Sequence, residues 1–216
     1  MIADVSFDGT SLFSMGWLRE SVDFPTPQSQ TNTIVVPGRN SPIRFTEALG
    51  RVSYQTRSFS ITLSMLGTRE KFNAMVGVLA NRYAGKLTKV ILNEEPGLFA
   101  IGTLELEPAY DPLTGRGQMA VSCSDGDSYR YHTEETVIQV TGGGILLLTN
   151  DAMPVVPTVT VMAETALAWS AGGDTFQKSV SAGTWTFPEL ELGAGDNHVE
   201  ITTEGSVTFR YREGRL

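Results

Sequence analysis

The apolar residues of this chain recur with two different spacings, and the spacing of an α-helix is found in one segment only. Between residues 67 and 86 the apolar side chains recur at intervals of three and four residues, which is the spacing of one face of an α-helix. Thr68 is a suitable N-cap and Gly85 can take the left-handed position after the last turn. The pattern predicts a helix over about 69–83. Gly77 lies inside it and suggests a close packing contact there. The apolar residues are Phe72, Met75, Val76, Leu79, Ala80 and Tyr83.

Almost everything else follows the two-residue period of β-strands. Before the helix, Phe59, Ile61, Leu63 and Met65 alternate with serine and threonine, which indicates a strand with one buried face. Three more strands are expected in this half, at 87–92, 99–106 and 118–123. We therefore expect an antiparallel sheet with one helix laid against it.

The second half has short strand patterns separated by frequent turns. The strands are expected at 158–162, 166–170, 184–187, 198–202 and 207–211. Short strands with turn signals every eight to twelve residues are typical of a β-sandwich. The predicted fold class is mainly β, with a β-sandwich or split-barrel-like N-terminal domain that carries one helix, followed by a second β-sandwich.

Glycine and charge indicate where the two domains meet. A glycine triplet, a short apolar run and two prolines follow one another between residues 141 and 157. From residue 138 onward the chain has 4 basic and 9 acidic residues, out of 16 basic and 24 acidic in all. We expect an N-terminal domain over 1–137, a linker over 138–150 with a hinge at the glycines, and a strongly acidic C-terminal domain over 151–216.

Composition excludes several classes of protein. No apolar run approaches the roughly 20 residues of a membrane span, and the N-terminus lacks the early Lys or Arg of a secretory signal. A net charge of −8 argues against specific nucleic-acid binding, which needs Lys and Arg on phosphates. One cysteine and two histidines are poor material for a metal site. We expect no metal, no cofactor and no enzymatic activity.

A few residues require a separate interpretation. Cys123 alternates with apolar residues and is expected to be a buried thiol, and Asp125 starts a solvated turn that lacks the further ligands of a calcium loop. His132 and His198 stand in polar contexts and are expected at the surface, and the alternative is that folding brings one of them near a carboxylate.

The two tryptophans of the acidic half, Trp169 and Trp185, have two interpretations. Core packing is the favoured one, and a sugar-stacking platform is the alternative.

A basic segment interrupts the acidic chain. Residues 36–59 hold Arg39, Arg44, Arg51 and Arg57 against a single acid, Glu47, and contain no lysine. Arginine without lysine suits ion pairs at interfaces, because the planar guanidinium binds carboxylates in a bidentate way. One interpretation is an ordinary solvated hairpin. The other is an extended arm that docks on an acidic surface of a neighbouring copy, with these four arginines as candidate interface residues.

The order of the segments resembles a known family. The opening strand with its FDG turn, VPGRN, YQTRSFSITLSM, REKFNAMVGVLANRY and LTKVILNEEPGLFAIGTLE are similar to the N-terminal domain of the siphophage distal tail protein (Dit) family. The end, LGAGDNHVEITTEGSVTFRYREGRL, resembles that family's C-terminal galectin-like sandwich. The resemblance covers nearly the whole chain and rests on the order and spacing of loose motifs.

The resemblance implies a structural role in a long non-contractile phage tail. Members form a hexameric ring at the distal end, in the virion tail tip, after assembly in the host cytoplasm. Expected partners are further copies of the chain, possibly as stacked rings, with the tail tube, the tape measure protein and the receptor-binding hub, while DNA passes through the lumen. The family brings no catalytic residues, and its galectin-like domain typically lacks working sugar-binding residues.

Three other functions stay open on the sequence alone. One is a tail tube protein of related fold, which would normally lack the second acidic domain. Another is a carbohydrate-binding β-sandwich module, which would be a monomer with exposed tryptophans. A hydrolase with scattered carboxylates is the third.

Overall fold

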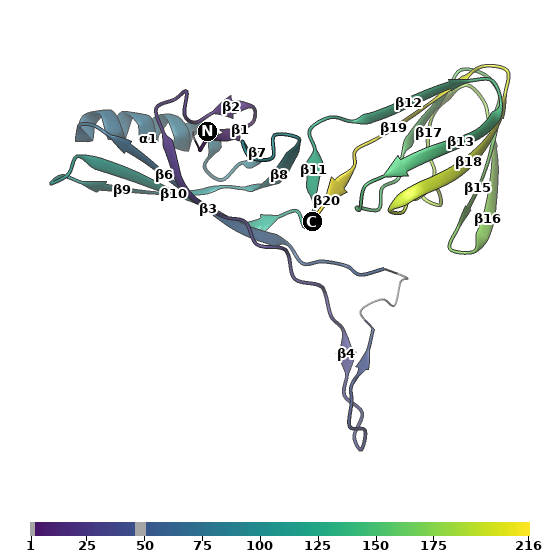
Figure 1. Ribbon diagram of the computed structural model, residues 1–216, viewed down its shortest axis with the longest axis horizontal. Helices are drawn as coiled ribbons and strands as arrows, with labels where there is room; N and C mark the ends of the chain where they lie inside the picture. The colour runs from purple at the N-terminus through teal and green to yellow at the C-terminus, as the bar shows by residue number, and fades with distance from the viewer. Residues whose placement is uncertain (1–2, 46–50) are drawn as a thin grey trace. The chain divides into compact units, whose positions relative to one another are not determined.

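The computed structural model describes residues 3–45 and 51–216. The chain divides into two compact units, Met1–Arg130 and Tyr131–Leu216, which we call unit 1 and unit 2 (Figure 1). Both are built mainly from antiparallel strands, and a single α-helix lies in the described part of unit 1. The predicted mainly-β fold class with one helix is confirmed.

Unit 1 contains two groups of paired strands. In spatial order the first sheet is β3 (Leu18–Asp23), β6 (Arg57–Leu66), β10 (Arg116–Gly126) and β9 (Glu105–Asp111). The second group is β2 (Thr10–Ser11), β1 (Val5–Phe7), β7 (Leu87–Leu92) and β8 (Leu98–Thr103). The alternation predicted around Phe59 is present in β6, whose odd-numbered residues face the core and whose even-numbered residues, Ser64 apart, face outward.

The helix α1 (Arg69–Tyr83) spans the residues over which the sequence predicts it. The Thr68 side chain caps it by accepting a hydrogen bond from the Lys71 amide, and Gly85 takes a left-handed φ of 67° just after its end. Phe72, Leu79 and Tyr83 form its buried face. Amphipathic burial therefore fixes the helix against the sheets of unit 1.

Glycines near the helix show where packing is close. A Cβ on Gly117 of β10 would lie 2.2 Å from the Phe72 ring, so the helix can approach this strand only because the residue is glycine. Gly77 is different, because a Cβ added there would meet nothing within 4 Å. The close contact expected at Gly77 is wrong.

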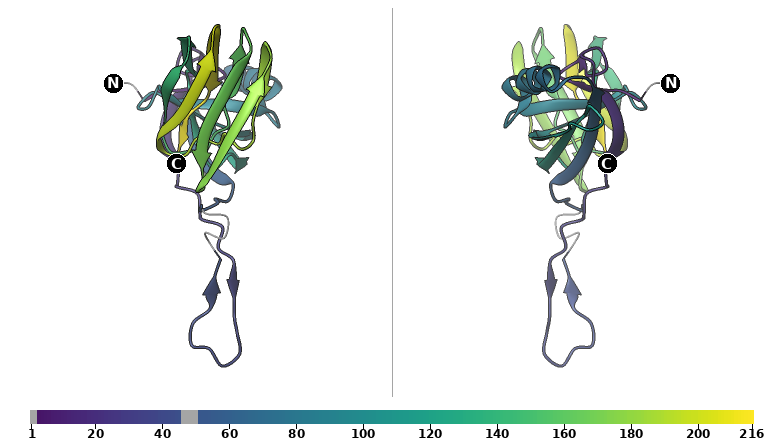
Figure 2. Two further views of the ribbon diagram at one scale, coloured as in Figure 1. Left: turned by 90° about the vertical axis from the view of Figure 1, so that its right-hand side faces the viewer. Right: turned by 90° about the vertical axis from the view of Figure 1, so that its left-hand side faces the viewer.

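One segment of unit 1 leaves the sheets. Residues 25–56 connect β3 to β6 and include β4 (Thr33–Ile34) and β5 (Ile43–Arg44), which pair only with each other. We call this segment the arm. Figures 1 and 2 show the described residues of the arm, 25–45 and 51–56, as a narrow extension that leaves the sheets of unit 1.

Unit 2 is a sandwich of two four-stranded antiparallel sheets. The first is β12 (Thr136–Thr141), β19 (Ser206–Tyr211), β14 (Thr158–Val161) and β17 (Gly183–Thr186). The second is β13 (Gly144–Asn150), β18 (Gly195–Thr203), β15 (Thr165–Ala171) and β16 (Asp174–Val180). A short pair, β11 (Arg130–His132) and β20 (Gly214–Arg215), completes the described strands.

The core of this sandwich lies between the two sheets. Leu148, Val159, Leu167, Val199 and Phe209 are completely buried there. Side-chain hydrogen bonds close its edges, since the Tyr211 hydroxyl donates to the Thr149 carbonyl oxygen at 2.6 Å. Unit 2 therefore has a hydrophobic core of its own.

The expected linker is wrong. Residues 138–141 lie in β12 and residues 144–150 form β13, and these strands pair along their length with β19 and β18. The units divide after Arg130 rather than after residue 137. The glycine triplet is a turn by which the chain passes from one sheet of the sandwich to the other, with φ of 82° at Gly142. A short apolar run beside glycines cannot distinguish a linker from a buried strand.

The strand expected at 99–106 is also wrong in part. It is broken at Leu104 into β8 and β9, which belong to different groups of strands. Leu104 is completely buried and its backbone forms a parallel bridge with Ala84. Periodicity alone gives no signal for such a transfer between sheets.

Candidate assembly site

The base of the arm is anchored by a buried arginine. The side chain of Arg57 donates to two backbone carbonyl oxygens, from Nη1 to Pro25 at 2.7 Å and from Nη2 to Ser128 at 3.0 Å. Its guanidinium also lies over the Phe24 ring, which stacks on Phe59 with centroids 4.6 Å apart. Burial and the nearby Arg130 lower the pKa of Arg57 from its ordinary value. Arg57 thus holds the arm to its own domain.

A short ladder continues from this anchor into the arm. The Gln55 amide donates to the Gln28 carbonyl oxygen at 2.8 Å, and the Gln30 amide donates to Ser53 at 2.7 Å. The Ser128 hydroxyl reinforces the ladder by donating to the Gln55 carbonyl oxygen at 2.7 Å. The near part of the arm is therefore fixed by backbone pairing and by contacts with residues next to β10.

The far part of the arm has no such cover. Every residue from 30 to 42 is exposed. The side chains there include large apolar ones, among them Val35 at 78% exposure and Ile34 at 54%. Phe45, just after β5, is 41% exposed. A two-stranded hairpin that exposes these side chains is marginal in water by itself, so this segment exposes an apolar surface that its own pairing does not cover.

The predicted interface arginines divide into two groups. Arg39, Arg44 and Arg51 are exposed, whereas Arg57 is buried at the base and cannot present its charge to a partner. Neither Arg39 nor Arg44 makes an ion pair with a residue that the structure describes. Glu47, the acid of the same segment, lies outside the described residues. The exposed arm thus combines apolar side chains with positive charge.

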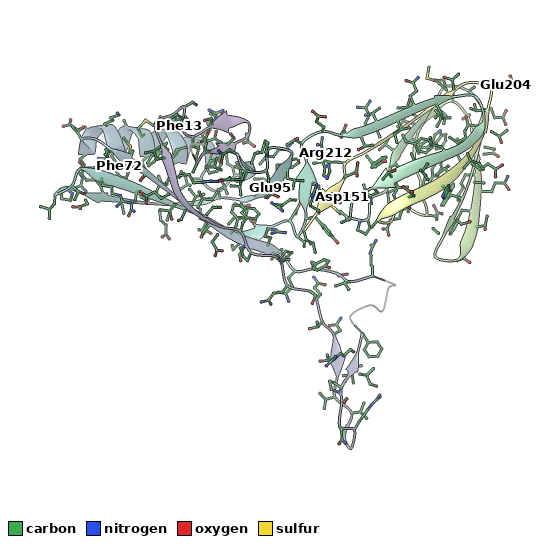
Figure 3. The ribbon with its side chains drawn as sticks, in the orientation of Figure 1. Phe13, Phe72, Glu95, Asp151, Glu204 and Arg212 are labelled. Carbon is green, nitrogen blue, oxygen red and sulfur yellow. The ribbon has the colours of Figure 1, made fainter. Side chains whose placement is uncertain are left out.

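A second group of charges lies in unit 2. The Asp151 carboxylate contacts His132 Nε2 at 2.9 Å and Arg215 Nε at 3.0 Å (Asp151 is labelled in Figure 3). Arg212 donates to the carbonyl oxygens of His132 and Thr133 at 2.6 and 2.8 Å. His132 is partly exposed, at 30% of its side chain, and folding brings it next to the carboxylate of Asp151. This cluster ties the C-terminal residues to the start of unit 2.

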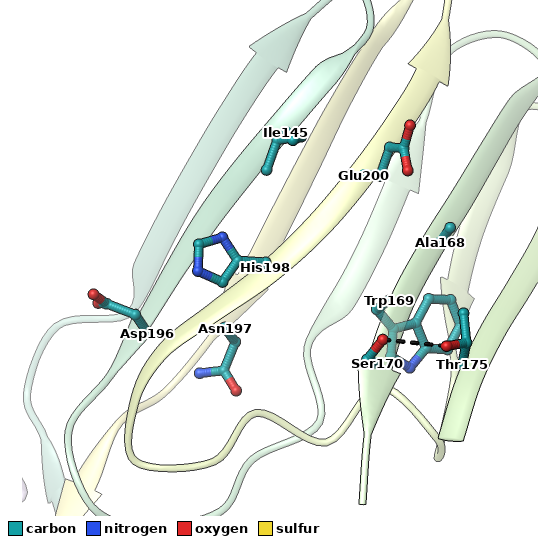
Figure 4. Close-up of a pocket in the computed structure, with 9 residues that line it drawn as sticks. All are labelled: Ile145, Ala168, Trp169, Ser170, Thr175, Asp196, Asn197, His198 and Glu200. Atoms are coloured by element: carbon teal, nitrogen blue, oxygen red, sulfur yellow. Dashed lines mark hydrogen bonds between the residues drawn. The ribbon is translucent and has the colours of Figure 1, made fainter. Parts of the chain in front are cut away.

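The outer face of the β13–β18–β15–β16 sheet contains a shallow pocket (Figure 4). His198 and Glu200 of β18 line it, with Ile145 of β13 and Ser170 of β15. His198 is exposed, as the sequence predicts. The pocket therefore lies along the sheet, beside the edge strand β13.

The two tryptophans do not form one platform. Trp169 is 4% exposed, packs against Phe176 and Phe187 in the core, and donates its indole N–H to the Glu189 carbonyl oxygen. Trp185 is 38% exposed on β17, in the other sheet. Trp169 thus follows the packing interpretation.

The remaining residues singled out by the sequence have structural roles. Cys123 is buried, and burial raises the pKa of its thiol to about 11. Hydrogen bonding by Thr103, through its side chain first and then through its amide at 2.8 Å, lowers the pKa of the Asp125 carboxyl group. Across residues 3–45 and 51–216, no three His, Cys, Asp or Glu side chains gather as a possible metal site. No helix in these ranges is long and apolar enough to cross a membrane.

Comparison with known proteins gives a clear result for the fold. The SPP1 Dit (gp 19.1) protein, described as a paradigm of the hub adsorption apparatus in phages that infect Gram-positive bacteria, matches with a TM-score of 0.74. The match covers 100% of both chains at 13% sequence identity. This chain therefore has a Dit-like fold over its whole length. No protein-family model matches the sequence, and no curated protein does so either.

The basic segment is visible in the sequence, but the role of Arg57 as the anchor of the arm is not. The anchor of Arg57 depends on the carbonyl oxygens of Pro25 and Ser128, which are 32 and 71 residues away. One signal was available. An arginine that opens an alternating strand at an inward-facing position has to be paired within the protein, because its charge cannot be buried alone.

Proposed function

We propose that this chain is a structural subunit of a phage tail tip and that it assembles as a homo-hexameric ring. Unit 1 would form the ring around a lumen and unit 2 would face outward. The partners would be further copies of the chain, the tail tube, the tape measure protein and the receptor-binding hub. The ring would belong to the virion and be assembled in the host cytoplasm.

The observation that carries this proposal is the exposed arm on a Dit-like fold. The fold match extends over both chains completely, so it includes both units. The arm supplies what the fold alone does not, a surface on which residues 30–42 are all exposed and several are apolar. A ring closes through heterologous contacts, in which one surface of each copy meets a different surface of the next. An extended arm is suited to such a contact.

The net charge agrees with a channel for DNA. A lumen through which DNA moves must not hold phosphate groups, and a net charge of −8 disfavours such contacts. A tail tube protein is a weaker candidate, because such a protein would normally lack the compact second unit that this chain has. A carbohydrate-binding module is weaker too, because Trp169 is buried.

Electron microscopy of the purified full-length chain tests the proposal. We expect closed six-membered rings with a central channel, singly or stacked face to face. Particles of a single chain at all accessible concentrations would contradict the proposal, and so would open filaments.

A further inference from the structure

The strand β13 forms an open edge of unit 2. It is the outermost strand of its sheet, which has the order β13, β18, β15, β16. Its seven residues, GILLLTN, include no charged residue and no proline, and they pair with β18 without a register shift. Proteins normally protect an edge strand with charge, proline or a bulge, because its free backbone groups can pair with another chain. The edge of β13 is therefore able to accept a further strand.

The outward side chains of β13 are apolar. Ile145 is 77% exposed and Leu147 is 44% exposed. Leu146 and Leu148 point to the core, so the strand has apolar side chains on both faces. An antiparallel sheet with one face in water normally places polar residues on that face. A strand added beside β13 would cover this exposed apolar surface.

The shallow pocket of this sheet lies next to the same edge (Figure 4). It is lined by Ile145 of β13, Glu200 of β18, and Ala168 and Ser170 of β15. The register places Glu200 opposite Ile145 on the neighbouring strand. Because Ala168 and Ser170 are small, the pocket has room for one long side chain that enters from the edge across Ile145.

The charges at the pocket favour a cation. Asp196, His198 and Glu200 alternate along the outward face of β18, and all three line the pocket. None of the described residues that line it is a lysine or arginine. Glu200 makes no ion pair with any residue in the ranges 3–45 and 51–216. A Lys or Arg side chain in the pocket would give this carboxylate a partner.

We propose that β13 is a docking edge for an extended basic segment of a different polypeptide. The segment adds an antiparallel strand to the sheet, with an apolar residue opposite Leu147 and a Lys or Arg opposite Ile145. The apolar stem of that basic residue lies along Ile145 while its charged end reaches Glu200. In contacts of this kind the backbone hydrogen bonds supply affinity, and the pocket for an alternate side chain supplies specificity.

The neighbouring strand is about 4.8 Å away in a sheet, so the added strand would lie about 10 Å from β18. A Lys or Arg side chain and the Glu200 side chain span this distance together. The contact lies wholly within unit 2, so it is open to a single chain as well as to a ring. It is a surface beyond those that the proposed ring requires.

Two other occupants fit the surface less well. A second β13 would cover the apolar side chains, but it would bring a second Glu200 and Asp196 and no positive charge. The strands β4 and β5 have two residues each and are too short to pair along the seven residues of β13. A strand that satisfies both the edge and the acids therefore comes from another protein.

Binding of synthetic peptides to the full-length chain tests the inference. The basic probe is the fluorescent heptapeptide TTVVVKT, which places valine opposite Leu147 and lysine opposite Ile145 in the antiparallel register. The acidic probe, TTVVVET, differs only at the lysine. A third probe has the basic sequence with alternate amides N-methylated, which removes the backbone donors that pair with a strand edge. Fluorescence anisotropy measures each dissociation constant.

We expect the basic probe to bind at least about tenfold more tightly than the acidic one, and the methylated probe not to bind. Glu200→Gln should remove the preference for lysine. No binding of the basic probe, equal affinity for the basic and acidic probes, or binding of the methylated probe would each overturn the inference. The assembly state of the chain is measured separately, so these failures leave the proposed function standing.

A variant of the edge itself is the second test. Ile145→Lys places a charge on an exposed side chain of β13, so unit 2 keeps its fold while the edge becomes protected. Binding of the basic probe should be lost. Met162→Lys is the matched control, because Met162 is 69% exposed elsewhere on unit 2, and it should leave binding unchanged. Equal effects of the two substitutions would contradict docking at β13.

Discussion

The arm and the sandwich of unit 2 are both antiparallel β structure, yet the sandwich buries its apolar side chains and the arm exposes them. In the sandwich, Val159 and Phe209 are completely buried between two sheets. In the arm, Ile34 and Val35 lie on a hairpin with no second layer and remain mostly exposed. Backbone pairing organises both, but only the sandwich supplies its own core. The arm leaves its own apolar side chains uncovered.

Removing the far arm should have the largest effect. Gln30 and Ser53 are hydrogen-bonded across the arm, so deletion of residues 31–52 with a two-glycine closure shortens it without breaking the base. We expect complete loss of assembly in sedimentation velocity, with the melting temperature within about 2 °C of wild type. Rings formed by the shortened chain would show that the arm is not the joining element.

Trp169→Ala, in contrast to the arm deletion, should lower the stability of unit 2. Its indole fills the core of unit 2 and donates to the Glu189 carbonyl oxygen. We expect the free energy of unfolding of unit 2 to fall by about 3–5 kcal/mol, measured by denaturant titration. Trp185→Ala, at a half-exposed site, is the control and should change it by less than about 1 kcal/mol. Similar losses would contradict the separate placement of the two tryptophans.

Arg57→Ala should loosen the base of the arm by a smaller amount. Its removal leaves the carbonyl oxygens of Pro25 and Ser128 without their donor, which should cost about 2 kcal/mol of unit 1 stability. Arg39→Ala removes an exposed charge and should leave thermal unfolding unchanged. Hydrogen exchange of the Gln30 and Gln55 amides would report the loosening. Unchanged protection of both amides in Arg57→Ala would refute the anchor.

Cys123 should show the smallest effect, confined to alkaline pH. Burial raises the pKa of the folded-state thiol from 9.0 to about 11, so the folded protein holds this proton more tightly than the unfolded chain. The stability that the protonated thiol contributes is complete below pH 9 and is lost as pH rises towards 11. Cys123→Ala should therefore lose less stability than wild type over this interval. Rapid reaction of the native thiol with a disulfide reagent at pH 8 would contradict its burial.

The sequence predicts the regular parts of the molecule well. The helix is predictable because Phe72, Leu79 and Tyr83 share one face and Thr68 is a strong cap. The five short strands expected in the second half correspond to β14, β15, β17, β18 and β19. These predictions rest on local periodicity, which survives folding wherever one face is buried.

The sequence-based predictions fail where the structure depends on contacts between residues far apart in the chain. The exchange between sheets at Leu104 and the pairing of β13 with β18 both depend on partners far along the chain. The same holds for the candidate site. Arg39, Arg44 and Arg57 belong to one charge pattern, yet Arg57 is buried by Pro25 and Ser128 while the other two stay exposed. Charge counting cannot separate an anchor from a contact residue.

Native mass measurement of the full-length chain beside an Arg39→Glu/Arg44→Glu variant tests the central claim most directly. Both arginines are exposed on the arm, so their reversal should leave the two units folded while it weakens docking on an acidic surface. We predict the mass of six chains, or a multiple of it, for the wild type and the mass of one chain for the variant. A wild-type monomer, or the same hexamer from both proteins, would contradict the account.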